Sequence, residues 1–393
     1  MPSAELVYLD HAATTPIDPR VVEAMLPYLR GGFGNPSSRY QLGMEALQAL
    51  SSARATMAQL LNAAKPPEII FTSCDSESDN LAIRGVAQAL RARGRHIVTS
   101  TIEHHAVSHT CQQLQRDEGY EITQVPVDAH GLVDPADVAA ALRPDTVLIS
   151  IIYANNEMGA IQPLAEIGAI AHARGVPFHT DAVQAVGHIP VDVQALDVDL
   201  LSLSGHKFHA PKGVGALYVR DGVPCRPLQT GGGQEFGLRA GTENVPYIVG
   251  LAAALRLACE ELSAEIPRLT GLRDRLVDNV LAEIPDSFLT GHPQQRLPGL
   301  ASFVFAGIDG EAAQLHLDMR GIACSTGSAC ASGEDSASPV LLAMGVDPRL
   351  ALSALRFSFG RGTTEAHIDR LLAVLPGIVA RLREMSPTYK SVH

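Results

Sequence analysis

The middle of the chain alternates short apolar segments with helical patterns, and this alternation limits the folds available to it. The apolar segments expected to be strands are Glu68–Thr72, His96–Ser100, Glu121–Val125, Val147–Ile152, Pro177–Thr180, Val198–Ser204 and Gly215–Val219. Helical patterns lie between most of them, as at Glu77–Arg93 and Leu164–Arg174. Strands that alternate with helices build a sheet covered by helices. The sequence therefore predicts an α/β fold with a mostly parallel seven-stranded sheet, whose ligands bind beyond the carboxyl ends of the strands.

The pattern changes after about Val245. Apolar residues then recur at helical spacings of three and four, from Leu269 to Ile284. A smaller α+β unit is expected beyond them, with strands at Ala301–Phe305 and Ala354–Phe359, helices at Glu311–Met319 and Glu365–Glu384, and a loop at Ser325–Ser338. We expect a large domain at about residues 15–250 and a small domain made of residues 1–14 and 251–393.

Composition excludes several classes of function. The 42 acidic and 30 basic residues give a net charge of −12, which disfavours nucleic acid and anionic membranes as partners. The apolar run from about Val245 to Leu255 is too short to span a bilayer, and we expect no signal peptide.

The six cysteines are scattered and form no CxxC pair, so neither a zinc site nor a disulfide framework is expected. They are Cys74, Cys111, Cys225, Cys259, Cys324 and Cys330. A reducing, cytoplasmic location fits, and there a loop cysteine can remain a reactive thiol.

Lysine is rare enough to narrow the search for a reactive amine. The chain has Lys65, Lys207, Lys212 and Lys390. Lys207 follows an apolar strand, in the position where α/β proteins bind ligands, and a partly desolvated lysine can act as a nucleophile. The ordinary alternative is a surface lysine, and Lys212, in a turn, is the local competitor.

Asp181 ends the strand that precedes the one leading to Lys207, so both residues should reach the same edge of the sheet. A carboxylate there could keep a pyridine nitrogen protonated, which makes the ring a stronger electron sink. The alternative for Asp181 is a helix N-cap.

Three further segments favour a phosphate-bearing ring as the ligand, and each has a plainer alternative. The segment 72–77 ends a strand and opens a helix, which offers free N–H groups to phosphate or simply caps the helix. His104 follows the next strand, where it could stack on a ring or lie at the surface. The glycine-rich segment 231–244 could bring Thr242 to phosphate or be a mobile connection.

Small residues surround Cys330 in the segment 325–333, so its thiol should be accessible. The alternative is a free surface cysteine, a liability that natural chains tend to avoid.

Together these segments resemble a cysteine desulfurase of the NifS/IscS type, within the class-V aminotransferase family of fold-type I pyridoxal-phosphate (PLP) enzymes. The resemblance spans nearly the whole chain. It is carried by the motifs Tyr8–Pro16, Gly34–Ser38, Asn155–Gly159, Ser204–Lys207, Gly327–Cys330 and Arg356–Arg361, in that order.

The resemblance implies roles for individual residues. Lys207 would hold PLP covalently and move protons, Asp181 would pair with the ring nitrogen, and His104 would stack on the ring and act as an acid or base. Gln184 would reach the ring oxygen, and Asn156 and Arg356 would bind the substrate carboxylate. The residues around the phosphate would be Asp75, Ser76, Ser204, His206 and, from a partner subunit, Thr242.

The implied reaction takes sulfur from L-cysteine, leaves alanine and places a persulfide on Cys330. The sulfur would pass to an acceptor or iron–sulfur scaffold protein, and Cys330 could transiently contact a cluster on that partner. The enzyme would be a homodimer without a resident metal. The chain departs from the family in one motif: the family usually has Ser-Gly-Ala-Thr-Glu where this chain has Ser-Cys-Asp-Ser-Glu at residues 73–77. Asp75 therefore places a carboxylate beside a dianionic phosphate, and Cys74 adds a second thiol near the cofactor.

Two alternatives stay open. One is another class-V reaction, such as a selenocysteine lyase, a different C–S lyase or an aminotransferase. The other is a catalytically weak scaffold-binding protein that keeps the fold.

Overall fold

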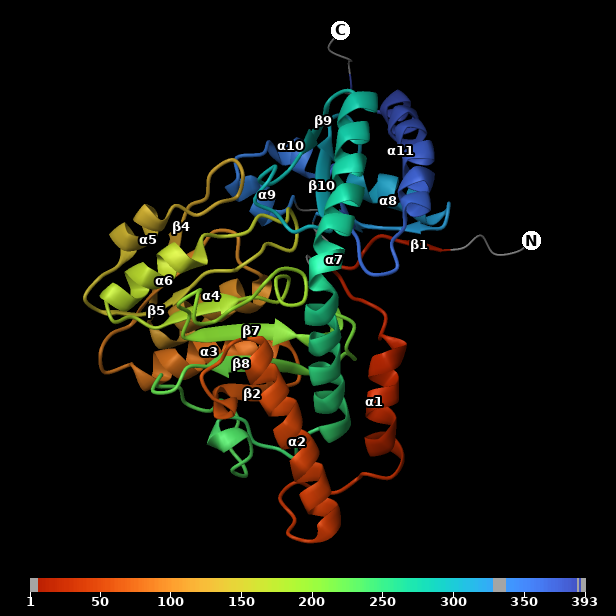
Figure 1. The fold of residues 1–393 in the computed structure, drawn as a ribbon. Coiled ribbons are helices and arrows are strands. Elements are labelled where there is room, and N and C mark those ends of the chain that lie inside the picture. Colours follow the sequence, from red (N-terminus) through yellow and green to blue (C-terminus); the bar gives the residue numbers. More distant parts are fainter. Residues whose placement is uncertain (1–5, 328–336, 387–388, 390–393) are drawn as a thin grey trace.

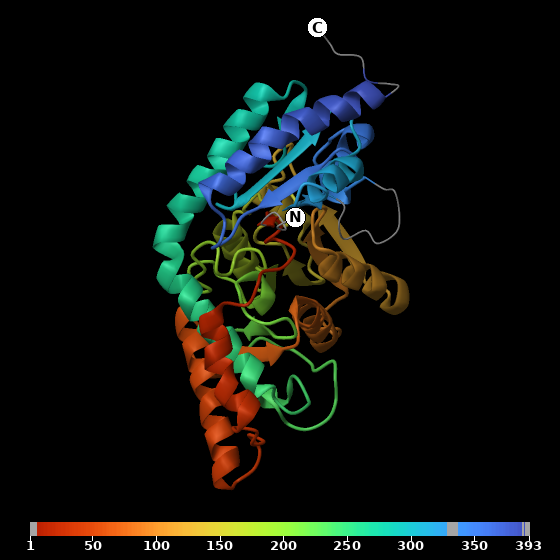
Figure 2. The same ribbon diagram turned by 90° about the vertical axis from the view of Figure 1, so that its right-hand side faces the viewer.

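The computed structural model describes residues 6–327, 337–386 and 389. Figures 1 and 2 show a large α/β part, a smaller unit that contains the C-terminal helix α11 (Glu365–Met385), and one long helix that runs along both. No helix in the described part of the chain has the length and apolar character needed to cross a bilayer.

The large part is built on a seven-stranded sheet with the strand order β2-β8-β7-β6-β5-β3-β4. Its strands are β2 (Ile69–Thr72), β3 (His96–Ser100), β4 (Glu121–Val125), β5 (Thr146–Ser150), β6 (Phe178–Asp181), β7 (Leu200–Ser204) and β8 (Gly215–Val219). The five neighbouring strands β7, β6, β5, β3 and β4 are mutually parallel, whereas β8 is antiparallel to both of its neighbours. Because β2 and β7 are both antiparallel to β8, their carboxyl ends lie at the same edge.

Helices bury both faces of this sheet, which explains why the strands read as continuous apolar runs. One apolar core lies between the sheet and helices α3 (Asp75–Ala89) and α4 (His105–Glu118). The core on the other face includes side chains from α1 (Pro19–Arg30), α2 (Gln41–Leu60), α5 (Pro135–Ala141), α6 (Leu164–Ala173) and α7 (Val245–Glu283).

The smaller unit has its own sheet and its own core. Its sheet has the strand order β12-β13-β10-β9 and is antiparallel throughout. The elements are β9 (Ser287–Leu289), β10 (Leu300–Phe305), α8 (Gly310–Asp318), β11 (Ile322–Ala323), β12 (Ser325–Thr326), α9 (Pro339–Ala343), α10 (Pro348–Ala351), β13 (Leu355–Ser358) and α11. The N-terminal strand β1 (Val7–Tyr8) pairs with β11, and Val7 and Leu9 join this core.

The structure confirms the predicted α/β fold with seven strands in one mostly parallel sheet. Several predicted boundaries were wrong. The strand β5 ends at Ser150 rather than Ile152, and α3 ends at Ala89 rather than Arg93. The predicted loop from Ser325 begins instead with β12, whose two buried residues pair with β13.

The division of the chain near residue 250 stays a prediction. Helix α7 is 39 residues long and runs without a break through that point, and Pro267 lies inside it.

Candidate active site

The residues singled out in the sequence follow strands whose carboxyl ends share one edge of the large sheet. Asp181 ends β6, Ser204 ends β7, and the segment from Ser73 follows β2. His104 and Asn156 follow β3 and β5. The parallel order of β3, β5, β6 and β7 therefore brings segments that are distant in the sequence together at one place.

Lys207 ends the short 3₁₀ turn that follows β7. Its Nζ donates hydrogen bonds to the carbonyl oxygens of Ala12 and Ala13, at 2.7 and 2.9 Å. Gln184 is buried and donates to the same Ala12 oxygen at 2.9 Å. The N-terminal motif thus lies against the amine, and Gln184 lies nearby; its contact with a ring oxygen stays a prediction.

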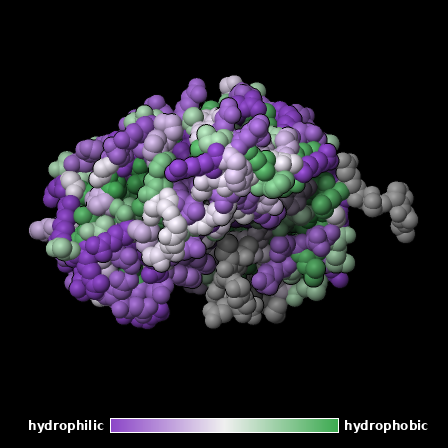
Figure 3. All heavy atoms as spheres, turned by 90° about the horizontal axis from the view of Figure 1, so that it is seen from below, coloured by the Kyte–Doolittle hydropathy of each residue, from purple (hydrophilic) through white to green (hydrophobic). Residues whose placement is uncertain are grey.

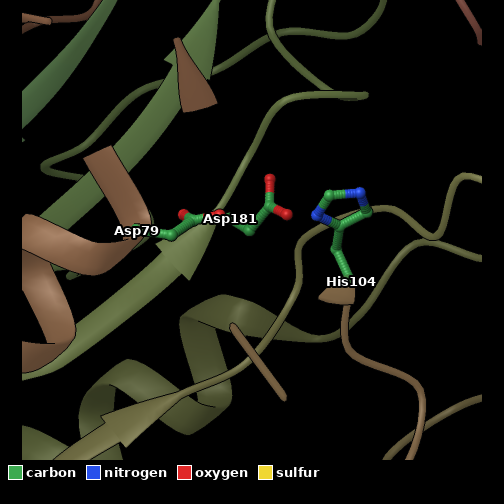
Figure 4. A group of neighbouring side chains, drawn as sticks. All are labelled: Asp79, His104 and Asp181. Atoms are coloured by element: carbon green, nitrogen blue, oxygen red, sulfur yellow. The ribbon is translucent and has the colours of Figure 1, made fainter. Parts of the chain in front are cut away.

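Asp181 lies between two other titratable side chains, Asp79 on α3 and His104 at the start of α4 (Figure 4). Potential ligand atoms of the three residues all lie within 4.8 Å of one another. Asp181 is buried, and its Oδ1 accepts from the N–H of Val183 at 2.9 Å. Burial raises the pKa of Asp181, while His104 opposes this rise. A buried carboxylate at the end of a strand can accept a hydrogen bond from a protonated ring nitrogen.

The predicted phosphate side holds a buried donor that lacks a partner. The hydroxyl of Ser204 has no hydrogen-bond partner among the described residues. Next to it in the sequence, His206 shares a 3.1 Å hydrogen bond with Thr14, and burial lowers its pKa to about 4. Ser76 is exposed in the first turn of α3. These groups offer hydrogen bonds to an anion.

Asp75 introduces a negative charge at the same place. It is the first residue of α3, after the N-cap residue Cys74. Its charge raises the pKa of Asp181 and that of Asp79, after burial, which is the larger cause in both cases. It raises the pKa of His206 against the lowering by burial. The carboxylate of Asp75 is therefore close enough to change the electrostatics of the candidate site.

The glycine-rich loop is anchored at two points. Glu235 forms a buried ion pair with Arg54, with N–O distances of 2.7 Å, and accepts from the N–H of Phe71. Arg239 donates to Glu77 at 2.9 Å, and Glu77 also accepts from the N–H of Ser73. Thr242 is exposed in this loop, so its contribution to a partner's site stays a prediction.

Arg356 on β13 reaches the site from the smaller unit. Its Nη1 donates to the carbonyl of Asn156 and its Nη2 to Asp10, both at 2.8 Å. The Nε of Arg356 is buried and has no partner among the described residues. The fixed guanidinium thus keeps one N–H donor for an incoming carboxylate.

Glu157 lies between the two units. The hydroxyl of Ser338 donates to its carboxylate. Burial raises the pKa of Glu157 to about 7, and Arg356 is among the groups that oppose this rise. Cys330 lies outside the described residues, so its role stays a prediction.

The sequence reasoning missed Asp10, Asp79 and Glu157. Asp79 follows Asp75 by one helical turn, a spacing that indicates a shared helix face. Glu157 and Asp10 lie in motifs that were recognised, but the role of each depends on Arg356 and Ser338, which are distant in the sequence. His104 has a further role as the N-cap of α4, where its Nδ1 accepts from Ala106.

Comparison with known proteins gives a consistent result. Residues 7–371 match the family Aminotransferase class-V. The chain is 52% identical to "Cysteine desulfurase IscS" of Methanosarcina thermophila, over 97% of this chain and 94% of that protein. It is 51% identical to "Cysteine desulfurase IscS" of Dictyoglomus turgidum, over 97% and 96%.

Among solved structures, a "NifS-like protein" superposes with a TM-score of 0.90 at 40% identity, covering 96% of this chain and all of that one. The structure titled "SspA in complex with cysteine" has a TM-score of 0.79 at 37% identity, covering 90% and 98%. The motifs, the sheet that brings them together and these full-length similarities agree: the chain belongs to the class-V aminotransferase family, among the cysteine desulfurases of the NifS/IscS type.

Proposed function

We propose that this protein is a PLP-dependent cysteine desulfurase that takes sulfur from L-cysteine onto Cys330. The observation that carries the proposal is that the Lys207 amine and the buried Asp181 carboxylate share one edge of the large sheet, where the buried Arg356 guanidinium reaches Asn156 from the smaller unit. The relatives named above are cysteine desulfurases, and one solved relative is titled as a complex with cysteine.

The described residues fit the cofactor. The partnerless hydroxyl of Ser204 suits a phosphate, and Asp181 suits a protonated ring nitrogen. Lys207 would hold PLP covalently, His104 would lie against the ring, Gln184 would reach the ring oxygen, and Ser76 and His206 would contact the phosphate. When bound, PLP supplies an electron sink that makes the substrate Cα acidic.

The protein's own residues would then divide the remaining work. Arg356 and the Asn156 side chain bind the substrate carboxylate, and this orients the substrate sulfur. Lys207 and His104 move protons. The Cys330 thiolate attacks the substrate sulfur, so that an S–S bond forms as the C–S bond breaks. The electron pair of that C–S bond stays with the carbon fragment, which takes up a proton and leaves as alanine.

The other cysteines support the choice of Cys330. Burial raises the pKa of Cys111, Cys225 and Cys324 to about 12, so their thiols are poor nucleophiles near neutral pH. Burial also raises the pKa of Cys259. Cys74, at the start of α3, is the competing thiol near the site.

Partners and location belong to the proposal as well. Exposed apolar side chains on α1, α2 and the loops beside them are typical of a surface that another subunit covers, as in a homodimer. They are Leu29, Phe33, Tyr40, Met44, Leu47 and Phe236. Figure 3 views the molecule from below, with apolar and pale side chains among the polar ones. An acceptor or iron–sulfur scaffold protein would receive the sulfur, and the reaction would take place in the cytoplasm.

The test is incubation of the purified protein with L-cysteine, measuring alanine and protein-bound persulfide together. We expect both products in equal amounts in the first turnover. Cys330→Ala should abolish persulfide formation, whereas the matched variant Cys74→Ser should keep it. Undiminished desulfuration by Cys330→Ala would reject this mechanism in favour of another class-V C–S lyase.

A further inference from the structure

Asp79 is a carboxyl group buried directly behind the residue that would anchor the cofactor ring. It projects from α3 and is fully buried. Neither of its carboxyl oxygens has a hydrogen-bond partner among the described residues. In Figure 4 Asp181 lies between Asp79 and His104, with ligand atoms of all three within 4.8 Å of one another.

The groups that face Asp79 supply little positive charge. From β6 come Asp181 and His179, whose Nε2 lies 3.5 Å from Asp79. Burial lowers the pKa of His179 to about 3, and its ring nitrogens share hydrogen bonds with the hydroxyls of Ser150 and Ser202. The imidazole is therefore neutral at physiological pH.

Two further acidic residues act on Asp79, besides the Ser202 hydroxyl, which acts to lower its pKa. Glu103 lies just before His104, and Asp75 lies on α3 itself; the charges of both act in the same direction as that of Asp181. Two buried carboxyl groups this close cannot both ionise cheaply, because each anion loses its hydration and repels the other. One of the pair should keep its proton.

The contacts decide which one keeps it. Asp181 has a backbone donor in Val183, and His104 and Lys207 both favour its anion. Asp79 has no backbone donor in the described part of the chain, and only the Ser202 hydroxyl acts to lower its pKa. Burial, followed by the charge of Asp181, outweighs this and raises the pKa of Asp79 well above the ordinary value.

We propose that Asp79 is a positioning residue that stays protonated and neutral, so that the single negative charge of the pair remains on Asp181. The effect of this protonation state on catalysis rests on the proposed function, in which the protein uses PLP. An ionised Asp79 would increase the proton affinity of Asp181 and draw the proton away from the ring nitrogen. A neutral Asp79 leaves that proton on the ring and preserves the electron sink.

Infrared spectroscopy tests the protonation directly, because a protonated carboxylic acid has its own carbonyl-stretch band. We expect this band at neutral pH in both the cofactor-free and the loaded protein, and its partial loss in Asp79→Asn. Glu103→Gln is the matched control, because burial raises the pKa of Glu103 to about 8. It should remove a different component of the band. An unchanged spectrum in correctly folded Asp79→Asn would overturn the proposal.

A pH titration supplies the second readout. The unfolded chain loses the Asp79 proton first as the pH rises, so the stability of the cofactor-free protein should decline above the ordinary pKa of the group, 3.8. Asp79→Asn should flatten this decline, and in the loaded protein it should remove an alkaline change in the cofactor's visible absorption. A steeper decline in the variant would show that Asp79 is needed as an anion. If Lys207 carries no cofactor, the proposed function fails, while the infrared band of the cofactor-free protein still decides the state of Asp79.

Discussion

The buried ion pair between Arg54 and Glu235 makes a quantitative prediction about the glycine-rich loop. The two side chains are 8% and 1% exposed, and they are joined by two hydrogen bonds of 2.7 Å. The Arg54 guanidinium also lies over the rings of Phe71 and Phe236, at 4.6 and 5.0 Å. Glu235 and Phe236 have φ angles of 45° and 58°, a strained region for residues other than glycine. The pair therefore holds a strained turn in place.

Removing one partner leaves the other charge buried and unpaired. Glu235→Gln or Arg54→Met should therefore lower the free energy of unfolding by about 3–5 kcal/mol. Each single variant leaves a buried charge without its partner, whereas the double variant removes both charges. The double variant should therefore lose less free energy of unfolding than the two single variants together, with a coupling energy of roughly 2 kcal/mol or more.

Urea denaturation of the two single variants and the double variant measures this coupling. Arg143 is the matched control, since it pairs with Asp145 at 2.9 Å while both side chains are about 40% exposed. Arg143→Met should cost no more than about 1 kcal/mol. Strict additivity of the Arg54 and Glu235 substitutions, or equal losses at Arg143 and Arg54, would refute the reasoning.

Two further predictions concern charge and pH. Asp75→Ala should slow the loss of PLP on dialysis by about tenfold, because it removes a carboxylate beside the phosphate. Asp75→Asn should have the same effect, and faster loss of PLP from either variant would contradict the argument. Burial lowers the pKa of His11 from 6.5 to about 4. The unfolded chain therefore binds this proton first as the pH falls, and stability is lost between those two values. His11→Gln should make urea midpoints less dependent on pH in that range, whereas an unchanged slope would show that His11 does not contribute.

The sequence predicted the central sheet well because its strands are short, apolar and bounded by turns. The strand ends then placed Asp181, His104 and Lys207 at one edge, since the carboxyl ends of parallel strands meet there. The predictions failed where tertiary contacts override local patterns. Residues Ser325 and Thr326 form a strand because β13 lies beside them.

The long-range polar contacts could not be predicted from the sequence either. Arg54 and Glu235 are 181 residues apart, and Arg356 and Asp10 are 346 apart, so nothing local indicates either pair. Asp79 looks like an ordinary helix-surface carboxylate in the sequence. Only the packing of α3 against the sheet shows that it is buried behind Asp181.

The most direct test of the account is to identify which residue holds the cofactor. The purified protein would be treated with borohydride, digested and mapped by mass spectrometry. We predict a reduced pyridoxyl group on Lys207, and its absence from the Lys207→Ala variant. A label on Lys212 or another lysine, or no label after incubation with PLP, would contradict the account.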